Sequence, residues 1–449
     1  METEKKIYNG GYLMKKSLLI LGPVSSRSGY GDHARDVALS FIDLDKFDVK
    51  IIDCNWGQTP KTALDEVTDE RLSKIKDRLW TDTSKNPWPD RPDVYVDIRI
   101  PNEFQQIGKY NIGVTAGIES NAVSQKWVEC CNKMDLIIVP SEHSKLGITH
   151  SVYEMNKKLP DGSQQKIGDL KTEKPVEVLF EGIDEDIYKP IHHKEIDSEF
   201  FDWLNDTVPE KFAYLFVGLW GKGNYGEDRK DIGRLIKVFC ETFANKKKQP
   251  ALILKTCGAT FSVLDKAAMK QKISQIKNMF PKDIKLPPIY LLHGDLSKKE
   301  MNYLYNHPKV KCMVSFTHGE GFGRPLFEAS MVGLPVVAPA FSGQLDFLNK
   351  DESILLGGTM DKIAPSQVWE NILIPESQWF TIEENNARNA LDHMKNNHHL
   401  WVKSATSLMN KNRKKFTREN MTIELGKILD KHLKIKNKLN LPKLQKIED

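Results

Sequence analysis

The sequence lacks a long apolar run, a signal-peptide core and any framework of paired cysteines. None of its 449 residues belongs to an apolar run near the roughly 20 residues that span a bilayer. Residues 1–13 are charged and polar, and we expect them to form a flexible leader. The six cysteines are scattered without a CxxC pair, which indicates reduced thiols and excludes a zinc or disulfide framework. We therefore expect a cytoplasmic protein without stable membrane insertion.

A strong excess of one charge is also missing. The chain has 65 Lys and Arg against 61 Asp and Glu, a net charge of +4, so no global basic surface points to nucleic acid. The region from 411 onward is locally basic. We favour the solvated face of closing helices there, with an anionic lipid surface or DNA as the alternative.

Short apolar runs alternate with helix-length segments along most of the chain. We expect strands in the first half at 17–22, 47–54, 94–100, 111–115, 136–140 and 176–180. In the second half we expect them at 212–218, 251–255, 289–293, 310–316 and 335–338. Strands that alternate with helices predict α/β domains with doubly wound, mostly parallel sheets.

A polar, charged stretch from Pro190 to Pro209 separates the two halves. A chain of this length suits two domains of ordinary size. The predicted organisation is an N-terminal domain over 1–190, a linker over 191–210, a C-terminal domain over 211–410 and basic helices over 411–449 that could pack back on the first domain. Ligands of such sheets bind outside the carboxyl ends of the strands, so the site should lie in the cleft between the domains.

The segment that carries the most chemistry runs from Val314 to Leu348. A strand is followed by a loop with glycines at every second position, and Pro325 then stands where a first helical turn would begin. Glycines let backbone N–H groups approach a ligand closely, and a helix N-terminus favours negative charge such as a diphosphate. Glu328, one turn into that helix, should stay ionised and can accept two hydrogen bonds from a ribose diol, while Glu320 reaches another part of the ligand.

These residues resemble a known family. The segment HGEGFGRPLFEASMVGLPVVAP is similar to the Glu-x7-Glu signature of the retaining family-4 glycosyltransferases of the GT-B fold. Further segments resemble other family elements in the same order along the chain: DLIIVPSEHSK, VLFEGIDEDIYKP, FVGLWGKGNYGEDRKDIGRLIKVF and YLLHGDLSKKEMNYLYN. The resemblance implies two Rossmann-like domains that face each other across a cleft, with the acceptor on the N-terminal side and a nucleotide-sugar donor on the C-terminal side.

The resemblance also implies roles for individual residues. Glu320 would contact the transferred sugar, next to the loop residues Gly321, Phe322 and Gly323, and Glu328 would bind the donor ribose. Two further groups would line the donor site: Lys230 of the pair Arg229-Lys230, which neutralises the departing diphosphate, and Gly29 and Gly31 of the N-terminal loop SRSGYGDHAR, which faces that diphosphate. Ser342 and Gly343 follow the strand at 335–338 and would line the donor pocket.

The sequence departs from the family at two places. Many members have an arginine after the glycine of the strand that here reads Phe-Val-Gly, whereas this chain has Leu219, and Lys222 or Arg229 would have to supply the charge. Many members also have a histidine after the strand that reads IGVT here, and this chain has none. Glu119 is the nearest polar candidate: it could orient the acceptor or relay its proton, or it could cap the next helix.

The family uses no metal, and we expect none here, nor any cofactor apart from the donor itself. The sequence Asp184-Glu185-Asp186 has a metal-binding DxD form but lies in the turn that closes the first domain, and His318 could equally be a structural residue or a donor contact. The acceptor stays open between a glycan, a small molecule, a lipid and DNA. A donor-binding scaffold without activity and a GT-B-fold sugar-nucleotide epimerase remain as alternative functions.

Overall fold

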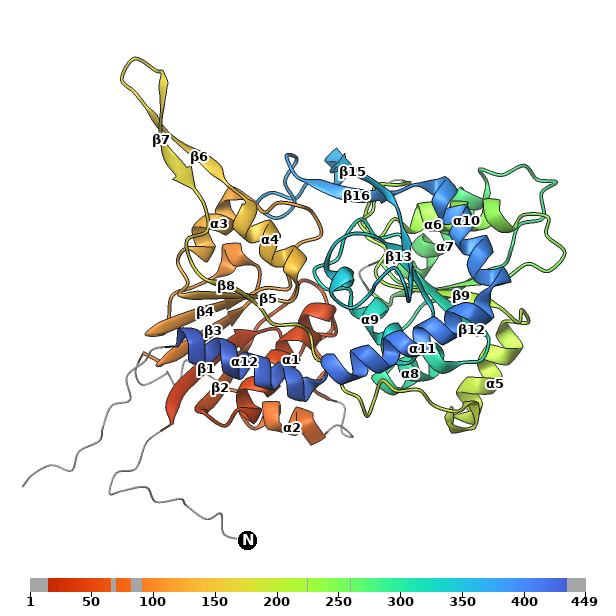
Figure 1. Cartoon of the computed structure of the whole chain (residues 1–449), viewed down its shortest axis with the longest axis horizontal. Coiled ribbons are helices and arrows are strands. Elements are labelled where there is room, and N and C mark those ends of the chain that lie inside the picture. The colour runs from red at the N-terminus through yellow and green to blue at the C-terminus, as the bar shows by residue number, and fades with distance from the viewer. Residues whose placement is uncertain (1–14, 66–69, 82–90, 224, 259, 434–449) are drawn as a thin grey trace, which may run out of the picture.

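The computed structural model describes residues 15–65, 70–81, 91–223, 225–258 and 260–433, which form two α/β domains side by side (Figure 1). The leader expected at 1–13 and the last part of the predicted basic region, 434–449, lie outside the described residues.

The N-terminal domain is built on a parallel sheet of six strands in the order β2-β1-β3-β4-β5-β8. The strands are β1 (Lys16–Gly22), β2 (Phe47–Asp53), β3 (Val94–Ile98), β4 (Tyr110–Val114), β5 (Leu136–Val139) and β8 (Val176–Val178). Its helices are α1 (Gly29–Asp43), α2 (Glu70–Lys76), α3 (Gln125–Cys131) and α4 (Glu142–His150). Strands β3, β4 and β5 are almost continuous apolar runs because helices cover both faces of the sheet.

The C-terminal domain repeats this plan with the strand order β11-β10-β9-β12-β13-β14. The strands are β9 (Ala213–Val217), β10 (Ala251–Lys255), β11 (Ile289–Leu292), β12 (Val310–Val314), β13 (Val336–Pro339) and β14 (Ile354–Leu356). The helices are α6 (Ile232–Phe243), α7 (Val263–Lys277), α8 (Lys298–Asn306), α9 (Arg324–Met331) and α10 (Glu384–Asn396). The prediction of two doubly wound parallel sheets is confirmed, and the expected strands lie within a few residues of their observed positions.

Residues 191–210, where we expect a linker, contain helix α5 (Ser198–Thr207). It is buried through Leu204, which packs with Val208 into the core of the C-terminal domain. The chain returns to the first domain through α11 (His398–Lys415) and α12 (Arg418–His432), which run along both domains in Figure 1. Met421 and Leu425 of α12 are part of the N-terminal core.

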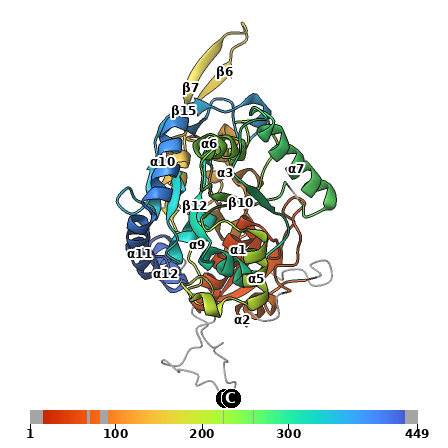
Figure 2. The same cartoon turned by 90° about the vertical axis from the view of Figure 1, so that its right-hand side faces the viewer.

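Two hairpins are absent from the sequence-based prediction. One joins β6 (Tyr153–Lys158) to β7 (Gln164–Leu170) and projects from the N-terminal domain (Figures 1 and 2). The other joins β15 (Gly358–Lys362) to β16 (Gln378–Ile382), and the loop between its strands places Ile372 against a core of the N-terminal domain. This second hairpin therefore contributes to the contact between the domains.

Candidate functional site

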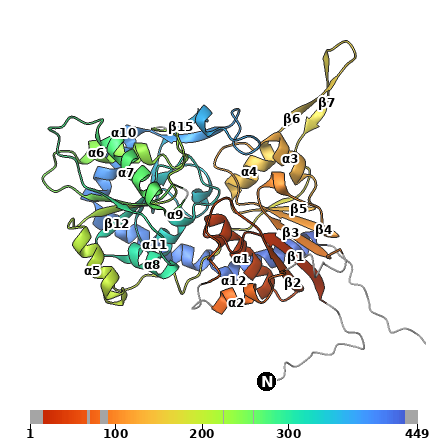
Figure 3. The ribbon, with the colours of Figure 1, turned by 180° about the vertical axis from the view of Figure 1, so that it is seen from behind.

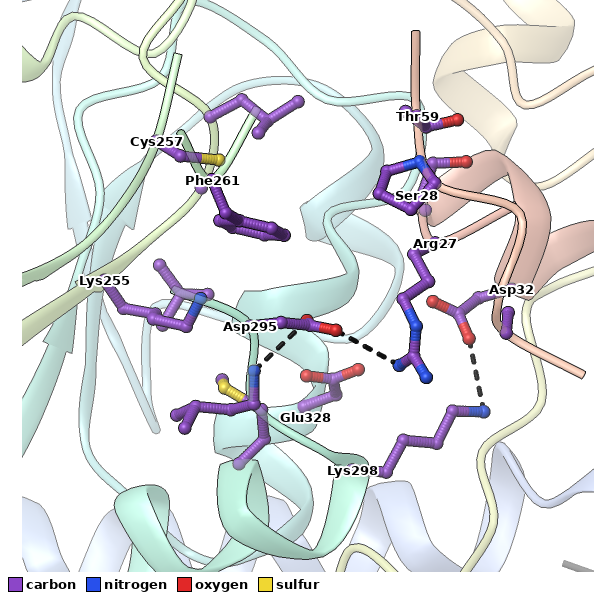
Figure 4. A pocket seen from close by; sticks show the side chains of 18 of the residues that line it. Arg27, Ser28, Asp32, Thr59, Lys255, Cys257, Phe261, Asp295, Lys298 and Glu328 are labelled. Carbon is purple, nitrogen blue, oxygen red and sulfur yellow. Dashed lines mark hydrogen bonds and ion pairs between the residues drawn. The ribbon is translucent and has the colours of Figure 1, made fainter. Parts of the chain in front are cut away.

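A cavity of about 310 Å³ lies between the two domains. Figure 4 shows side chains from both domains around it. Arg27 comes from the loop before α1 and Asp32 from its first turn, and the C-terminal domain contributes Lys255, Asp295, Lys298 and Glu328. The C-terminal residues stand at or just after the carboxyl ends of β10 and β11 or on the following helices. This is the edge of the sheet at which doubly wound folds bind ligands.

Two ion pairs cross the cavity from one domain to the other. Arg27 lies 3.3 Å from Asp295, and Lys298 lies 3.2 Å from Asp32, which also accepts a hydrogen bond from Arg35 at 2.8 Å. Burial alone would raise the pKa of Asp32, but Lys298 and Arg35 hold it well below its usual range. Asp32 is therefore an anion, and the cavity wall is a set of paired charges.

Glu328 lines the cavity from α9. The helix begins at Arg324 with Pro325 in its first turn, as the sequence predicts. Glu328 accepts a hydrogen bond of 3.0 Å from the hydroxyl of Tyr305 and lies 3.4 Å from the guanidinium of Arg324. Burial raises the pKa of Glu328 above its ordinary value, and Arg324 opposes that shift. The partner that favours the ionised form is thus a specific arginine, which the sequence argument did not identify.

Arg324 connects this wall to the N-terminal domain. Its Nη1 lies 2.7 Å from Asp36 Oδ2 and 3.2 Å from Glu181 Oε2. Burial raises the pKa of Glu181 to about 7, against the lowering effect of Arg324, and burial lowers the pKa of the nearby His33 to about 4. This buried cluster fixes Glu328 relative to both domains. All three residues lie in or next to segments that resemble family elements, but their distance along the chain left their pairing unpredicted.

Glu320 and Lys230 form a buried ion pair, which brings two predicted site residues together. Burial would raise the pKa of Glu320, but Lys230 and Arg229 lower it below its ordinary value. Burial likewise lowers the pKa of Lys230, and Glu320 opposes that shift. The pair therefore places a carboxylate and a cation next to each other in a buried site.

Arg229 pairs with Glu119 of the N-terminal domain, so the second cation of the Arg-Lys pair crosses the cleft. The interpretation of Glu119 as a helix cap is wrong, because the side chain of Ser124 caps α3. Glu119 is instead the anionic partner of Arg229.

The glycine loop touches the N-terminal domain directly. A Cβ atom added at Gly319 would come within 1.9 Å of the carbonyl oxygen of Glu119, and one at Gly321 within 1.9 Å of that of Ala116. The hydroxyl of Ser141 donates a hydrogen bond of 2.5 Å to the carbonyl of Gly321. Any side chain at these two glycines would hold the domains apart.

Ser342 and Gly343 support this loop from behind. The backbone N–H of Glu320 donates to the Ser342 hydroxyl at 2.9 Å, and the N–H of Gly343 donates to the carbonyl of Glu320 at 3.0 Å. The ring of Phe322 is buried in the core, and Gly323 caps α9 at the positive φ of 100°. These residues do not line the cavity: they fix the backbone of Glu320.

The two predicted glycines of the N-terminal loop differ. Gly29 lines the cavity, and a Cβ atom there would meet nothing within 4 Å. Gly31 is buried behind it, where a Cβ atom would come within 2.1 Å of the carbonyl oxygen of Ser26. Gly29 thus borders the space for a ligand, and Gly31 allows the tight turn.

Leu219 lines the cavity at the place of the missing arginine and is 49% exposed. Lys222 is exposed and is not among the cavity-lining residues, so it does not replace that charge. Lys255 does line the cavity, and its ammonium group donates to the carbonyl of Gly294 at 2.6 Å. Lys255 is thus a cation in the same cavity as Leu219.

No cluster of three or more His, Cys, Asp or Glu side chains that could hold a metal ion occurs in the described part of the chain. Asp184 of the DxD sequence pairs with Arg71. His318 is buried, stacks on Trp379 at 4.1 Å and contacts the carbonyl of Phe380 at 2.8 Å, which is a structural position. No helix in the described residues combines the length and apolar character that crossing a bilayer requires.

Comparison with known proteins gives similarity in structure only. No family model and no curated protein sequence matches the chain.

Among solved structures, sucrose-phosphate synthase from Thermosynechococcus elongatus matches with a TM-score of 0.59 and 12% identity over 93% of this chain and 98% of its own. Anabaena Alr3699/HepE in complex with UDP and glucose matches with a TM-score of 0.58 and 12% identity over 93% and 100%. A trehalose 6-phosphate synthase from Burkholderia multivorans gives 0.55 and 11% over 93% and 99%. These similar structures are GT-B glycosyltransferases, and the chain has their fold of two Rossmann-like domains facing across a cleft.

Proposed function

We propose that this protein transfers a sugar from a nucleoside-diphosphate sugar to an acceptor, with retention of configuration and without a metal ion, in the manner of the family-4 glycosyltransferases. The observation that carries the proposal is the arrangement around the glycine loop: Glu320 is paired with the buried Lys230, and Glu328, eight residues further along, lines a cavity between two GT-B domains.

The cavity would hold the nucleotide part of the donor. Its volume of about 310 Å³ is at the lower end of ligand pockets, which run from about 300 to 1,000 Å³. The Glu328 carboxylate can accept hydrogen bonds from the ribose diol, and Gly29 leaves the space for phosphate oxygens. A neighbour of the same fold, Anabaena Alr3699/HepE, was solved with UDP-glucose, which supports this class of ligand.

The chemical step requires the diphosphate to leave the anomeric carbon with its bonding electrons. The leaving group gains negative charge, and a buried ammonium such as Lys230 stabilises that charge most in the transition state. Glu320 would hold hydroxyl groups of the transferred sugar. The acceptor hydroxyl attacks from the same face, and its proton passes to the departing phosphate.

One observation favours a donor-binding scaffold instead, since Leu219 stands in the cavity where many family members have an arginine. Lys255 lies in the same cavity and can supply a positive charge to the diphosphate. We therefore keep transfer as the proposal and test activity separately from binding.

The test begins with the melting temperature of the purified protein against UDP-, GDP- and ADP-sugars. We expect the sugars of one nucleotide class to raise the melting temperature. With that donor the protein should transfer the sugar slowly to water or to an added acceptor and so release the nucleoside diphosphate. The anomeric signal of the product, read by NMR, should show retention. A folded protein that binds a donor but releases no diphosphate with any acceptor would support the scaffold, and one that no donor stabilises would contradict the proposal.

A further inference from the structure

The hairpin of β6 and β7 has no partner for its exposed strands. It extends away from both domains in Figures 1 and 3, and its two strands pair only with each other among the described residues. Three apolar side chains in or next to it are open to solvent: Val152 is 53% exposed, Met155 39% and Ile167 60%. Only its base is anchored, through Tyr153 and Leu170, which pack against the core of the N-terminal domain.

The two edges of this hairpin differ. Met155 pairs with Gly168, and the next residue, Asn156, pairs with Lys166, so Ile167 is an extra residue that makes a bulge in β7. Bulges disturb an edge strand and hinder the addition of another strand. Strand β6 carries no extra residue and presents a regular edge. A two-stranded hairpin is marginally stable in water, whereas a sheet of more strands is stable, so β6 is the edge at which a further strand would add.

The charges of β6 are complementary to a second copy of the same strand. Glu154 lies near the base, and Lys157 and Lys158 lie near the tip. If two β6 strands pair antiparallel with Asn156 opposite its own copy, Glu154 of each strand stands opposite Lys158 of the other. These residues share one face of the strand, and opposite charges in this position stabilise a sheet. Met155 then stands opposite Lys157 on the other face.

From the regular edge and this charge pattern we propose that β6 is a dimerisation edge, at which a second copy of the chain pairs around a twofold axis at Asn156 to complete a four-stranded sheet. Such an interface is isologous, because the same strand serves both subunits. The backbone hydrogen bonds of strand addition provide the affinity. Glu154, which pairs with Lys166 of its own hairpin at 3.0 Å, would extend this pair to Lys158 of the second copy and so define the register. This interface does not depend on the proposed transfer reaction.

A cysteine at the axis tests the register. In Asn156→Cys the two new cysteines would stand opposite each other across the axis. Their Cα atoms would lie about 4.5–5.5 Å apart, a distance at which a disulfide forms. We expect mild oxidation to give a covalent dimer of this variant. Lys157→Cys is the matched control, because its copy lies two residues along the strand, beyond about 7 Å, and it should stay monomeric on a denaturing gel. Equal cross-linking of both variants would overturn the proposal.

Charge reversal tests the energetics by analytical ultracentrifugation of the full chain. Lys158→Glu places two pairs of like charges opposite each other and should weaken dimerisation about tenfold. Lys157→Glu makes the same charge change without facing a carboxylate and should have a smaller effect. A wild-type protein that remains monomeric at all concentrations, or a Lys158→Glu variant that dimerises as tightly as the wild type, would contradict the proposal. Far-UV circular dichroism verifies that each variant is folded.

Discussion

The two ends of the cleft between the domains are built in different ways. Beside Glu328 the domains stand apart around a cavity, and ion pairs such as Lys298–Asp32 cross it. Around Glu320 they touch, since the backbone of Gly321 lies against that of Ala116. We call the second region the closed corner: the loop from Gly319 to Phe322 together with residues 116–119.

The charges of the closed corner are paired within the chain. In the closed corner each cation has an anion from the chain itself: Lys230 pairs with Glu320, and Arg229 with Glu119. A buried charge left without a partner is unfavourable, so these pairs stabilise the contact between the domains. We infer that the cavity is prepared for the nucleotide, while the closed corner must rearrange to admit the transferred sugar.

The largest effect should come from removing the cation of the closed corner. Lys230→Met keeps the length and volume of the side chain but, under the proposed transfer reaction, would leave the departing diphosphate without a buried ammonium. We expect kcat/KM for transfer to fall about 10³-fold, with a smaller loss of donor affinity. Lys270→Met, at an exposed position on α7, is the control and should behave as wild type. A loss below tenfold would mean that Lys230 does not act on the leaving group.

The second effect is on the pH dependence of the free energy of unfolding, and it comes from the buried cluster of Arg324, Asp36 and Glu181. Because burial raises the pKa of Glu181 to about 7, the folded protein holds this proton more tightly than the unfolded chain. The stabilisation is complete below about pH 4.5 and is lost as the pH rises through 7, a change on the order of 3 kcal/mol in the free energy of unfolding. Glu181→Gln should flatten this dependence between pH 5 and 8 in urea unfolding.

Glu129→Gln, at a half-buried position on α3, is the matched control for that experiment and should keep the wild-type slope. An unchanged slope in Glu181→Gln would show that the carboxyl group of Glu181 is not the source of this pH dependence.

The smallest effect should come from the anion that crosses the closed corner. If the Glu119 carboxylate competes with the donor diphosphate for Arg229, Glu119→Gln should bind the donor a few-fold more tightly, by roughly 1 kcal/mol or less, with kcat nearly unchanged. If Glu119 relays the acceptor proton instead, kcat falls and the donor affinity stays constant. Titration calorimetry and steady-state kinetics on the same variant distinguish the two, with Glu129→Gln again as the control.

The sequence predicts those features of the fold and the site that depend on the order of neighbouring residues. The alternating apolar runs identify both sheets, and the glycine spacing before Pro325 identifies the loop and the start of α9. The hairpin of β6 and β7 gave no such signal, because a strand exposed on both faces shows no alternation of apolar and polar residues. Contacts between distant segments were also out of reach: Asp36 and Glu181 lie far from Arg324 in the chain, and only the packed domains bring them together.

The most direct test of this account is the affinity of the cavity for the nucleotide itself, measured by titration calorimetry with UDP, GDP and ADP. One of the three should bind the wild-type protein, and Glu328→Gln, which replaces the carboxyl group by an amide, should weaken that binding roughly 10- to 100-fold. Equal affinity in the variant and the wild type, with both proteins folded, would contradict the placement of the nucleotide beside Glu328.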